Sequence, residues 1–467
     1  MLVAAELARW AVALQPDQVP VDVEQAARCH LLDGVGCLLA GLRTGVVNAA
    51  ITVATDLGGP PEATVIGTAS RLSAPGAAFA NGALVHGLDF DDTHAEGLVH
   101  ATAVVLPAAF GVGEQVGASG RDILTAAVVG YETICRVAAA SPHGFHERGL
   151  HATQVAGVFA AALTTARLLA LGADRTTDAL GIAGSSAGGL LEFLTTGAST
   201  KQLHPGSAAS AGIMAARLAA AGASGPSSVF EGTNGLYAAL SARPADPARI
   251  VEGLGSRWET TRITIKRYPC CQLSQSSIQV LVAAAADEPL AAADIAEIVV
   301  QVHPDSIPVV CEPAAAKVYP RTSYDAKFSL PWTLAALLID GAITIDTYSK
   351  RSIARPEVAD LARRVRAVAA SADGAAADAP GHVVIHLRDG REIVRRQDDA
   401  STAIEHPHLA EAAVRHKLLG NVGGTPRMAD AIAAAVDGLG RGTELPDLLR
   451  AAGAASAATS PPIGATP

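Results

Sequence analysis

Aromatic and charged side chains are scarce in this sequence. Phe, Trp and Tyr account for 4% of its 467 residues, and Asp, Glu, Lys and Arg together for 17%, whereas 49% are hydrophobic. Disordered chains combine low hydrophobicity with high net charge, so this composition excludes disorder for most of the protein. At roughly 100–200 residues per domain, the length predicts two to four domains with a sizeable core.

CxxC motifs, basic runs and long apolar runs are also missing. The six cysteines form no CxxC pair, which argues against a structural zinc site, a disulfide framework and an iron–sulfur cluster. A net charge of −10 without any Lys/Arg-rich run argues against nucleic acid or a membrane as partner. Uncharged runs such as residues 72–88 fall short of the ~18–20 strongly apolar residues of a membrane span. Since no secretory signal is visible, we expect a cytoplasmic protein.

Helical periodicity dominates residues 1–260, where Ala, Leu and Gly recur with few charges. Helices are expected at residues 24–40, 120–138, 154–171 and 208–221. Because these segments carry so little charge, we expect them to be buried on most faces inside a large helical domain. Residues 401–450 are helical again and are expected to rejoin this domain, while residues 451–467 are predicted to form a disordered tail.

Short β-branched segments indicate a smaller unit at residues 261–400. Strands are expected at residues 261–265, 298–302, 383–387 and 391–395. The last two flank Asp389-Gly390, a strong hairpin turn signal. The predicted fold is therefore mostly α, with a large all-α domain built from N- and C-terminal segments and a smaller α+β domain.

Half of the 14 histidines lie between residues 86 and 204. The densest polar stretch runs from His86 to His100 and also contains Asp89, Asp91, Asp92, His94 and Glu96. Three interpretations are open. The aspartates can cap helices, the mixed side chains can hold a divalent cation, or the carboxylates can orient imidazoles and tune their basicity.

A repeated tripeptide favours the third interpretation. His-Ala-Thr occurs at residues 100–102 and again at residues 151–153, each time before an apolar helical stretch. We expect the threonines to be N-caps, which places both imidazoles at helix N-termini, where the helix dipole disfavours imidazolium and attracts anions. Lys201 precedes another helix, expected to start near residue 207. If these helix starts converge, they form a carboxylate pocket with neutral histidines as bases.

Two further polar motifs lie at residues 266–272 and 324–329. The first contains Lys266 and the adjacent Cys270 and Cys271, and forms either a tight domain crossing with buried thiols or the mouth of the same pocket. For the second, a structural role is the simpler interpretation. The glycines at residues 111–117 follow no strand, so we interpret them as helix-packing residues instead of a dinucleotide loop.

The polar stretch also resembles the signature of the 2-methylcitrate dehydratase (MmgE/PrpD) family, which includes cis-aconitate decarboxylase and iminodisuccinate epimerase. Matching motifs cover about residues 2–440. They are Leu31-Leu32-Asp33-Gly34, Ala80-Asn81-Gly82, Gly149-Leu150-His151, Thr200-Lys201-Gln202-Leu203-His204-Pro205-Gly206, Phe230-Glu231-Gly232, Tyr268-Pro269-Cys270-Cys271 and Ala326-Lys327-Phe328-Ser329. The resemblance implies a helical domain with a smaller α+β lid, a homodimer with its site in the cleft, and no metal or organic cofactor.

The resemblance also assigns site residues, with two departures. Residues that match the catalytic pocket of the family are Asp89, Thr93, His100, His151 and Lys201, and we expect further substrate contacts from His86, Lys266, Cys271 and Gln275. Many members of the family have histidine at the position of Gln275 in this chain. Cis-aconitate decarboxylase also has histidine at the position of Cys271 in this chain. Glutamine and a thiol cannot shuttle protons as imidazole does near neutral pH. The His-Ala-Thr segments replace His-Pro-Ser/Thr.

By this resemblance, the leading prediction is elimination of water from a hydroxylated di- or tricarboxylate. Proton abstraction next to a carboxylate needs a base and fixed cations. We assign the base to His151 or His100, the carboxylate clamp to Lys201, and positioning to Asp89 and Thr93. Decarboxylation or epimerisation would use the same groups. Two rivals are a metal-dependent all-α terpene synthase, for its acidic motif at residues 91–96, and a carboxylate-binding protein that has lost catalysis.

Overall fold

The computed structural model describes residues 2–397 and 407–459, which form two compact units. Of the described residues, the larger unit takes 2–191, 201–265 and 407–459, and the smaller takes 192–200 and 266–397. The C-terminal helices thus belong to the larger unit. The segment Glu192–Thr200, in contrast, belongs to the smaller unit although it lies inside the predicted helical domain.

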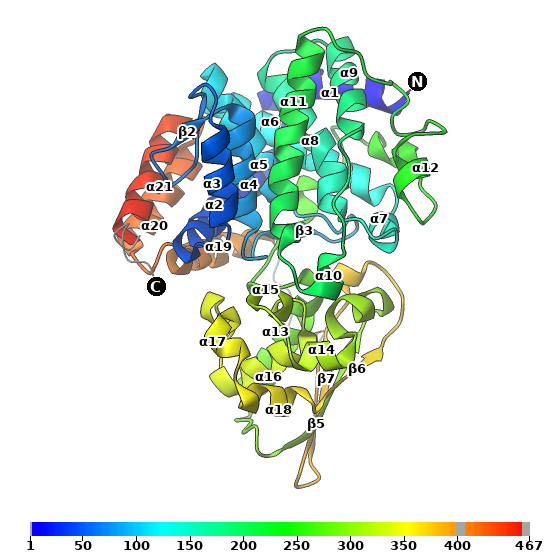
Figure 1. Ribbon diagram of the computed structural model, residues 1–467, viewed down its shortest axis with the longest axis vertical. Helices are drawn as coiled ribbons and strands as arrows, with labels where there is room; N and C mark the ends of the chain where they lie inside the picture. Colours follow the sequence, from blue (N-terminus) through cyan, green and yellow to red (C-terminus); the bar gives the residue numbers. More distant parts are fainter. Residues whose placement is uncertain (1, 398–406, 460–467) are drawn as a thin grey trace. The chain divides into compact units, whose positions relative to one another are not determined.

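The larger unit is a layered bundle of helices. Its helices are α1 (Val3–Ala13), α2 (Val21–Thr44), α3 (Asn48–Leu57), α4 (Ala74–His86), α5 (Thr102–Val116), α6 (Gly120–Ala139), α7 (Gly144–Glu147), α8 (Ala152–Leu168), α9 (Ala173–Gly184), α11 (His204–Ala220), α12 (Leu236–Leu240), α19 (Pro407–Asn421), α20 (Pro426–Gly438) and α21 (Leu445–Thr459). Figure 1 shows α19, α20 and α21, in orange and red, beside the blue α2. The four predicted helices correspond to α2, α6, α8 and α11.

Glycine allows the helices that carry the site to approach closely. A Cβ atom on Gly82 of α4 would lie 2.6 Å from Cα of Gly206 in α11, and one on Gly212 of α11 would lie 2.6 Å from the carbonyl oxygen of Val158 in α8. Such contacts leave no room for a side chain, so backbones pack directly against one another. Figure 1 shows α8 and α11 side by side as a result. This packing brings the end of α4 to the starts of α8 and α11.

Two short strand pairs complete the larger unit. β1 (Ala63–Thr64) pairs with β2 (Arg71–Leu72), and β3 (Asp92–His94) pairs antiparallel with β4 (Ile263–Ile265), with Thr93 opposite Thr264. The segment that was expected to open the α+β unit is therefore a partner of the acidic stretch. The pairing of β4 with β3 places this segment in the larger unit. The sequence did not predict this, because a three-residue strand carries no sequence signal for its partner.

The smaller unit holds a four-stranded sheet with strand order β6-β5-β7-β8. Its strands are β5 (Ile295–Val302), β6 (Val365–Ala369), β7 (His382–Leu387) and β8 (Glu392–Arg396). β5 and β6 are parallel and the other pairs antiparallel. The expected hairpin is confirmed, with Gly390 at φ +90° in its turn. The helices are α10 (Phe193–Thr196), α13 (Gln275–Asp287), α14 (Ala314–Val318), α15 (Ser323–Ala326), α16 (Leu330–Asp340), α17 (Lys350–Ile353) and α18 (Pro356–Ala362).

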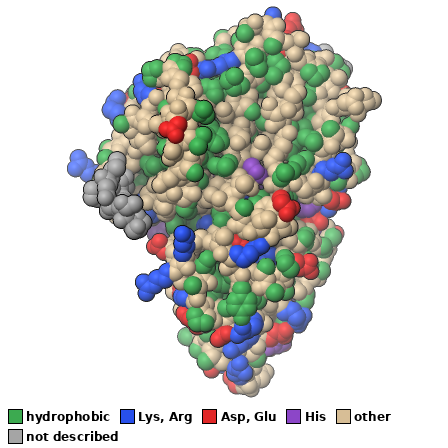
Figure 2. Space-filling model, in the orientation of Figure 1, with side chains coloured by type: hydrophobic (Ala, Val, Ile, Leu, Met, Phe, Trp, Pro, Cys, Tyr) green, Lys and Arg blue, Asp and Glu red, His purple; other side chains and the backbone are tan. Residues whose placement is uncertain are grey.

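The predicted fold class, mostly α with a smaller α+β part, is confirmed. Residues 451–459, which were expected to begin a disordered tail, form the end of α21, and the rest of that predicted tail lies outside the described residues. Acidic and basic side chains intermingle on the face seen in Figure 2, without a broad field of one sign. Among the described residues, no single helix has the length and apolarity to cross a bilayer; α2 and α3 meet that test only jointly, across a 94° bend.

Candidate active site

Three buried imidazoles from distant parts of the chain meet in the larger unit. His86 ends α4, His100 lies two residues before α5, and His151 is the N-cap residue of α8. Their ring centroids are 4.6 Å apart for His86 and His100, 5.7 Å for His100 and His151, and 5.8 Å for His86 and His151. The convergence expected from the two His-Ala-Thr segments is therefore present.

The threonines of those segments do not act as N-caps, contrary to our expectation. Thr102 is the first residue of α5 and Thr153 the second of α8, so both are already inside their helices. Asp92 supplies the cap of α5 instead, since its carboxylate accepts from the Thr102 N–H at 3.1 Å and from the Thr102 hydroxyl. Thr153 Oγ1 accepts the backbone N–H of His100 at 3.1 Å. The Thr153 hydroxyl thus ties the start of α8 to the segment just before α5.

Lys201 places an ammonium group beside the imidazoles. The residue precedes α11, which starts at His204 and not near residue 207. Its Nζ donates to Oδ1 of Asp89 at 2.8 Å and lies 3.2 Å from Nε2 of His100. Lys201 is 5% exposed and Asp89 is fully buried. Asp89 adopts a left-handed backbone conformation with φ +52°, which aspartate tolerates better than most residues. The expected grouping of Asp89, His100, His151 and Lys201 is present in the described structure.

Hydrogen bonds define the tautomer of His100. Its Nδ1 lies 2.8 Å from the carbonyl oxygen of Asp92 and 3.1 Å from Oγ1 of Thr93, and Thr93 Oγ1 itself donates to the same carbonyl. A carbonyl can only accept, so Nδ1 of His100 carries the proton. Nε2 is then the bare nitrogen and accepts from Lys201. Thr93 therefore positions this imidazole, while its contact with substrate remains a prediction.

His86 is oriented by a carboxylate. Both carboxylate oxygens of Asp91 lie 2.9 Å from Nδ1 of His86, and both side chains are fully buried. Nε2 of His86 has no hydrogen-bond partner among the described residues. Burial lowers the pKa of His86 below its usual value, although the negative charge of Asp91 opposes this. The pair is a neutral imidazole with a carboxylate behind it and an open nitrogen in front.

His151 is the most strongly perturbed imidazole of the group. Burial and then the charge of Lys201 lower its pKa well below the usual value. Its Nδ1 lies 3.2 Å from Nδ1 of His204, and its Nε2 has no hydrogen-bond partner among the described residues. A neutral imidazole with an open nitrogen beside an ammonium can take a proton from a substrate or return one, and the predicted role of His151 as the base remains a prediction.

Carboxyl groups behind the imidazoles form a second layer. Burial, and then the charge of Asp91, raises the pKa of Asp92 to about 7. Lys417 of α19 lies 2.7 Å from Oδ1 of Asp33 in α2 and donates to the carbonyl oxygen of Phe90 at 2.5 Å. The C-terminal segment thus supports the acidic stretch. Sequence reasoning missed Lys417, because only the return of α19 to the larger unit brings it here.

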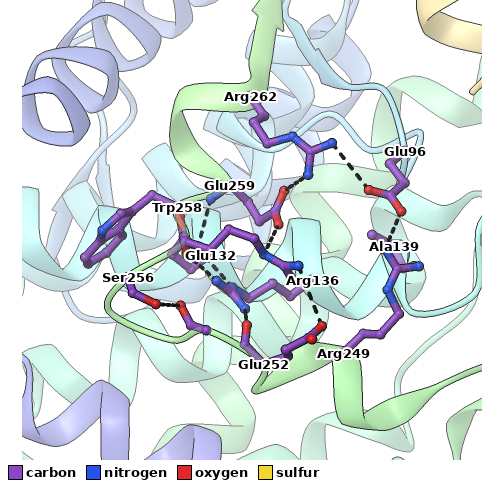
Figure 3. A network of polar contacts seen from close by, with 12 residues as sticks. Glu96, Glu132, Arg136, Ala139, Arg249, Glu252, Ser256, Trp258, Glu259 and Arg262 are labelled. Atoms are coloured by element: carbon purple, nitrogen blue, oxygen red, sulfur yellow. Dashed lines mark hydrogen bonds and ion pairs between the residues drawn. The ribbon is translucent and has the colours of Figure 1, made fainter.

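A polar network braces the strand pair that carries Asp92 and Thr93 (Figure 3). Glu132 of α6 accepts the backbone N–H groups of Glu259 and Thr260 at 3.1 and 2.8 Å and pairs with Arg136 at 3.0 Å. The carboxylate of Glu259 lies 3.1 Å from Nε2 of His94. Arg136 donates to backbone carbonyls of residues 250, 252 and 257. His94 therefore anchors β3 and is not part of the imidazole group.

Two overlapping sets of these side chains have the composition of a metal site. The first comprises His86, His100 and His151, and the second His86, Asp89, Asp91 and His100, with ligand atoms within 4.8 Å of one another. The ammonium of Lys201 already contacts Asp89 and His100 in this space, however, and an adjacent cation repels a metal ion. The donor set therefore fits a site in which Lys201 supplies the positive charge.

The remaining predicted contacts, Lys266, Cys271 and Gln275, belong to the smaller unit. Lys266 and Cys271 are buried there. Gln275 begins α13, and its amide accepts from the Tyr268 N–H at 3.1 Å and donates to the Tyr268 carbonyl at 2.9 Å. The oxygen and the nitrogen of the Gln275 amide are thus both bonded to the backbone of Tyr268, in the same sequence motif. A role of the three residues in binding substrate remains a prediction.

Neutral imidazoles, an ammonium and buried carboxylates at converging helix starts define an acid–base site suited to a small anionic substrate. The chain belongs to the MmgE/PrpD family: the N-terminal domain of that family matches residues 5–247 and its C-terminal domain matches residues 268–438. The predicted family membership is thus confirmed. It also argues against the terpene synthase alternative.

Curated relatives cover nearly the whole chain. A cis-aconitate decarboxylase of Aspergillus terreus is 30% identical over 478 aligned positions, which cover 96% of this chain and 95% of the relative. The cis-aconitate decarboxylases of Homo sapiens and Mus musculus are 29% and 28% identical, covering 73% and 84% of this chain and 72% and 80% of those proteins. These relatives support an enzyme of the MmgE/PrpD family.

Proposed function

We propose that this protein is a lyase that decarboxylates cis-aconitate or a closely related unsaturated tricarboxylate. The observation that carries the proposal is the contact between Lys201 and His100 beside His151, because it combines a fixed positive charge with neutral imidazoles. The names of the curated relatives favour decarboxylation over the elimination of water that the sequence resemblance placed first.

The chemistry of such a substrate explains why these groups are needed. When the carbon–carbon bond to one carboxylate breaks, carbon dioxide leaves and the electron pair forms a new double bond. The pair of the old double bond moves onto a carbon next to a remaining carboxylate, where one proton must be added. The ammonium of Lys201 stabilises the charge that develops on that carboxylate. Nε2 of His151 or His100 first takes up a proton from water, and the imidazolium that forms delivers this proton to the carbon.

Elimination of water is a second candidate. Nε2 of His86 and Nε2 of His151 both lack a hydrogen-bond partner among the described residues. A dehydratase needs one group to abstract a proton and another to protonate the leaving hydroxide, and two open imidazole nitrogens in one buried group meet that need. Epimerisation would use the same pair.

A substrate screen in deuterated water tests the proposal. The protein is incubated with cis-aconitate, citrate, 2-methylcitrate and iminodisuccinate and followed by proton NMR. Decarboxylation releases bicarbonate and places one deuterium in the product, whereas dehydration consumes citrate or 2-methylcitrate without loss of carbon. Turnover of cis-aconitate without carbon loss would refute the decarboxylase assignment. His151→Gln should abolish turnover, and the matched control His386→Gln, at a partly exposed position of β7, should not.

We also propose that the protein is a homodimer, as the family resemblance implies, and that it acts in the cytoplasm. Light scattering on the purified protein tests the first point. A mass of 47.2 kDa would indicate a monomer and contradict it.

A further inference from the structure

We propose that His204 is a positioning residue for His151: its Nδ1 accepts the Nδ1–H of His151 and thereby presents Nε2 of His151 as the reacting nitrogen. The proposal rests on the proposed function in so far as His151 exchanges a proton with the substrate. It assigns a task to a histidine that the family resemblance included only as part of the matching motif at residues 200–206.

The contact between the two rings permits only one shared hydrogen. Nδ1 of His151 lies 3.2 Å from Nδ1 of His204, and the ring centroids are 5.3 Å apart at an angle of 44°. Two nitrogens at this distance need one donor and one acceptor, so one ring carries hydrogen on Nδ1 and the other does not. Burial lowers the pKa of His204 to about 4, which leaves this ring neutral and able to accept near neutral pH.

Two features indicate His151 as the donor. Its Nε2 is buried without a partner among the described residues, and an orphaned N–H in a protein interior is rarer than an orphaned acceptor. Lys201 and the rings of His86 and His100 also surround this ring, and the nearby ammonium favours a bare nitrogen over an N–H directed into the group. A bare Nε2 places the hydrogen of neutral His151 on Nδ1.

The backbone around His151 and His204 leaves room for the contact between the two rings. Gly189 accepts the backbone N–H of His151 at 2.7 Å and has φ +91°, a conformation that favours glycine. A Cβ atom at this position would lie 3.2 Å from Nδ1 of His204 and 2.8 Å from Oε1 of Gln154. A side chain at residue 189 would therefore push against the pair. His151 at the start of α8 and His204 at the start of α11 are held by the close packing of these helices.

The hydrogen bond serves both protonation states of His151. In the neutral ring it leaves Nε2 free to take a proton. When Nε2 takes one, the imidazolium keeps its Nδ1–H pointed at a neutral acceptor, and a charge-assisted hydrogen bond is stronger than a neutral one. The proton on Nε2 can then pass to substrate carbon, and the ring returns to its starting tautomer. The balance is one proton gained and one proton delivered, both at Nε2.

Kinetics of two variants test the proposal. His204→Leu removes the acceptor, whereas His204→Asn retains an oxygen near the position of Nδ1. We expect His204→Leu to lower kcat about tenfold to a hundredfold with little change in KM, and His204→Asn to restore much of the loss. The limb of the kcat profile that reports His151 should move to lower pH in His204→Leu, because its imidazolium loses a partner while Lys201, His100, His86 and His146 still face it. An unchanged kcat and profile, or no rescue by Asn in a folded protein, would overturn the proposal.

Nitrogen NMR tests the tautomer without any turnover. In wild-type protein labelled with 15N-histidine, and assigned by comparison with His151→Gln, Nδ1 of His151 should be the protonated nitrogen. Replacement of His204 by Leu should move the signals towards a mixture of tautomers. A protonated Nε2 in the wild type would overturn the proposal. If the wild type turns over none of the four carboxylates, the proposed function fails, while this measurement still decides the role of His204.

Discussion

The ammonium of Lys201 lies 2.8 Å from the carboxylate of Asp89, and this buried ion pair is in direct contact with His100. Neither charge has more than slight access to solvent. The pair therefore has two tasks, because it keeps a positive charge beside the imidazoles and it balances a negative charge inside the protein.

Breaking this ion pair should lower both stability and turnover, and a second substitution should restore only the stability. Lys201→Met leaves Asp89 as a buried charge without its ammonium, so we expect a loss of about 3–5 kcal/mol in the free energy of unfolding, and loss of turnover. Adding Asp89→Asn should recover most of the stability but none of the activity, since asparagine tolerates the left-handed backbone at residue 89. Urea unfolding measures the first effect and the substrate assay the second.

The partly exposed pair of Arg355 and Asp340 is the matched control for Lys201. Its atoms lie 2.6 Å apart, but both side chains keep about a quarter of their surface exposed, at 25% and 29%. Arg355→Met should cost no more than about 1 kcal/mol and leave turnover intact. Equal costs for the two substitutions would contradict the buried character of the Lys201 pair.

Acid should destabilise the protein through His30. Burial lowers the pKa of this imidazole to about 4, while its Nε2 contacts the carbonyl oxygen of Thr260 at 3.0 Å. The pKa in the unfolded chain is about 6.5, so the stability is present above that pH and is lost as the pH falls through 4. His30→Gln keeps a donor but cannot titrate, and should remove about 3 kcal/mol of this pH dependence. Denaturant unfolding at a series of pH values measures it, and parallel curves for both proteins would refute it.

Asp92 should have the opposite pH dependence. Its folded-state pKa of about 7 is raised above the unfolded value by burial, so its contribution is fully present below about pH 4 and is lost as the pH rises through 7. Asp92→Asn retains an oxygen that can accept from the Thr102 N–H. The variant should gain stability relative to wild type between pH 4 and 8, by up to about 4 kcal/mol. A constant difference across this range would show that Asp92 is charged throughout.

Zinc should inhibit the enzyme instead of activating it. The nitrogens of His86, His100 and His151 lie close enough together to attract the ion, but Lys201 already supplies the positive charge there. We expect extensive dialysis against EDTA to leave turnover unchanged and added zinc to inhibit it reversibly. The variant His86→Gln should require more zinc for the same inhibition. Loss of activity on chelation, restored by metal, would contradict this prediction.

Local patterns predicted much of the helical unit. The bounds predicted for the helices at residues 24–40, 120–138 and 154–171 agree to within a few residues with those of α2, α6 and α8. Helical periodicity is a local property, because it depends on residues three and four positions apart. The hairpin of β7 and β8 followed from its Asp-Gly turn. β6 and the pairing of β3 with β4 were not predicted, since short strands depend on partners far away in the chain.

The sequence by itself determined the family, the mostly helical fold and the identity of His100, His151, Lys201 and Asp89 as a candidate site. Only the tertiary structure decided which nitrogen each imidazole presents. Asp91 holds Nδ1 of His86, a backbone carbonyl holds Nδ1 of His100, and His204 faces Nδ1 of His151. These partners come from different helix ends, which glycine contacts bring within hydrogen-bond distance, and a tautomer depends on the atom at that distance and not on the order of residues.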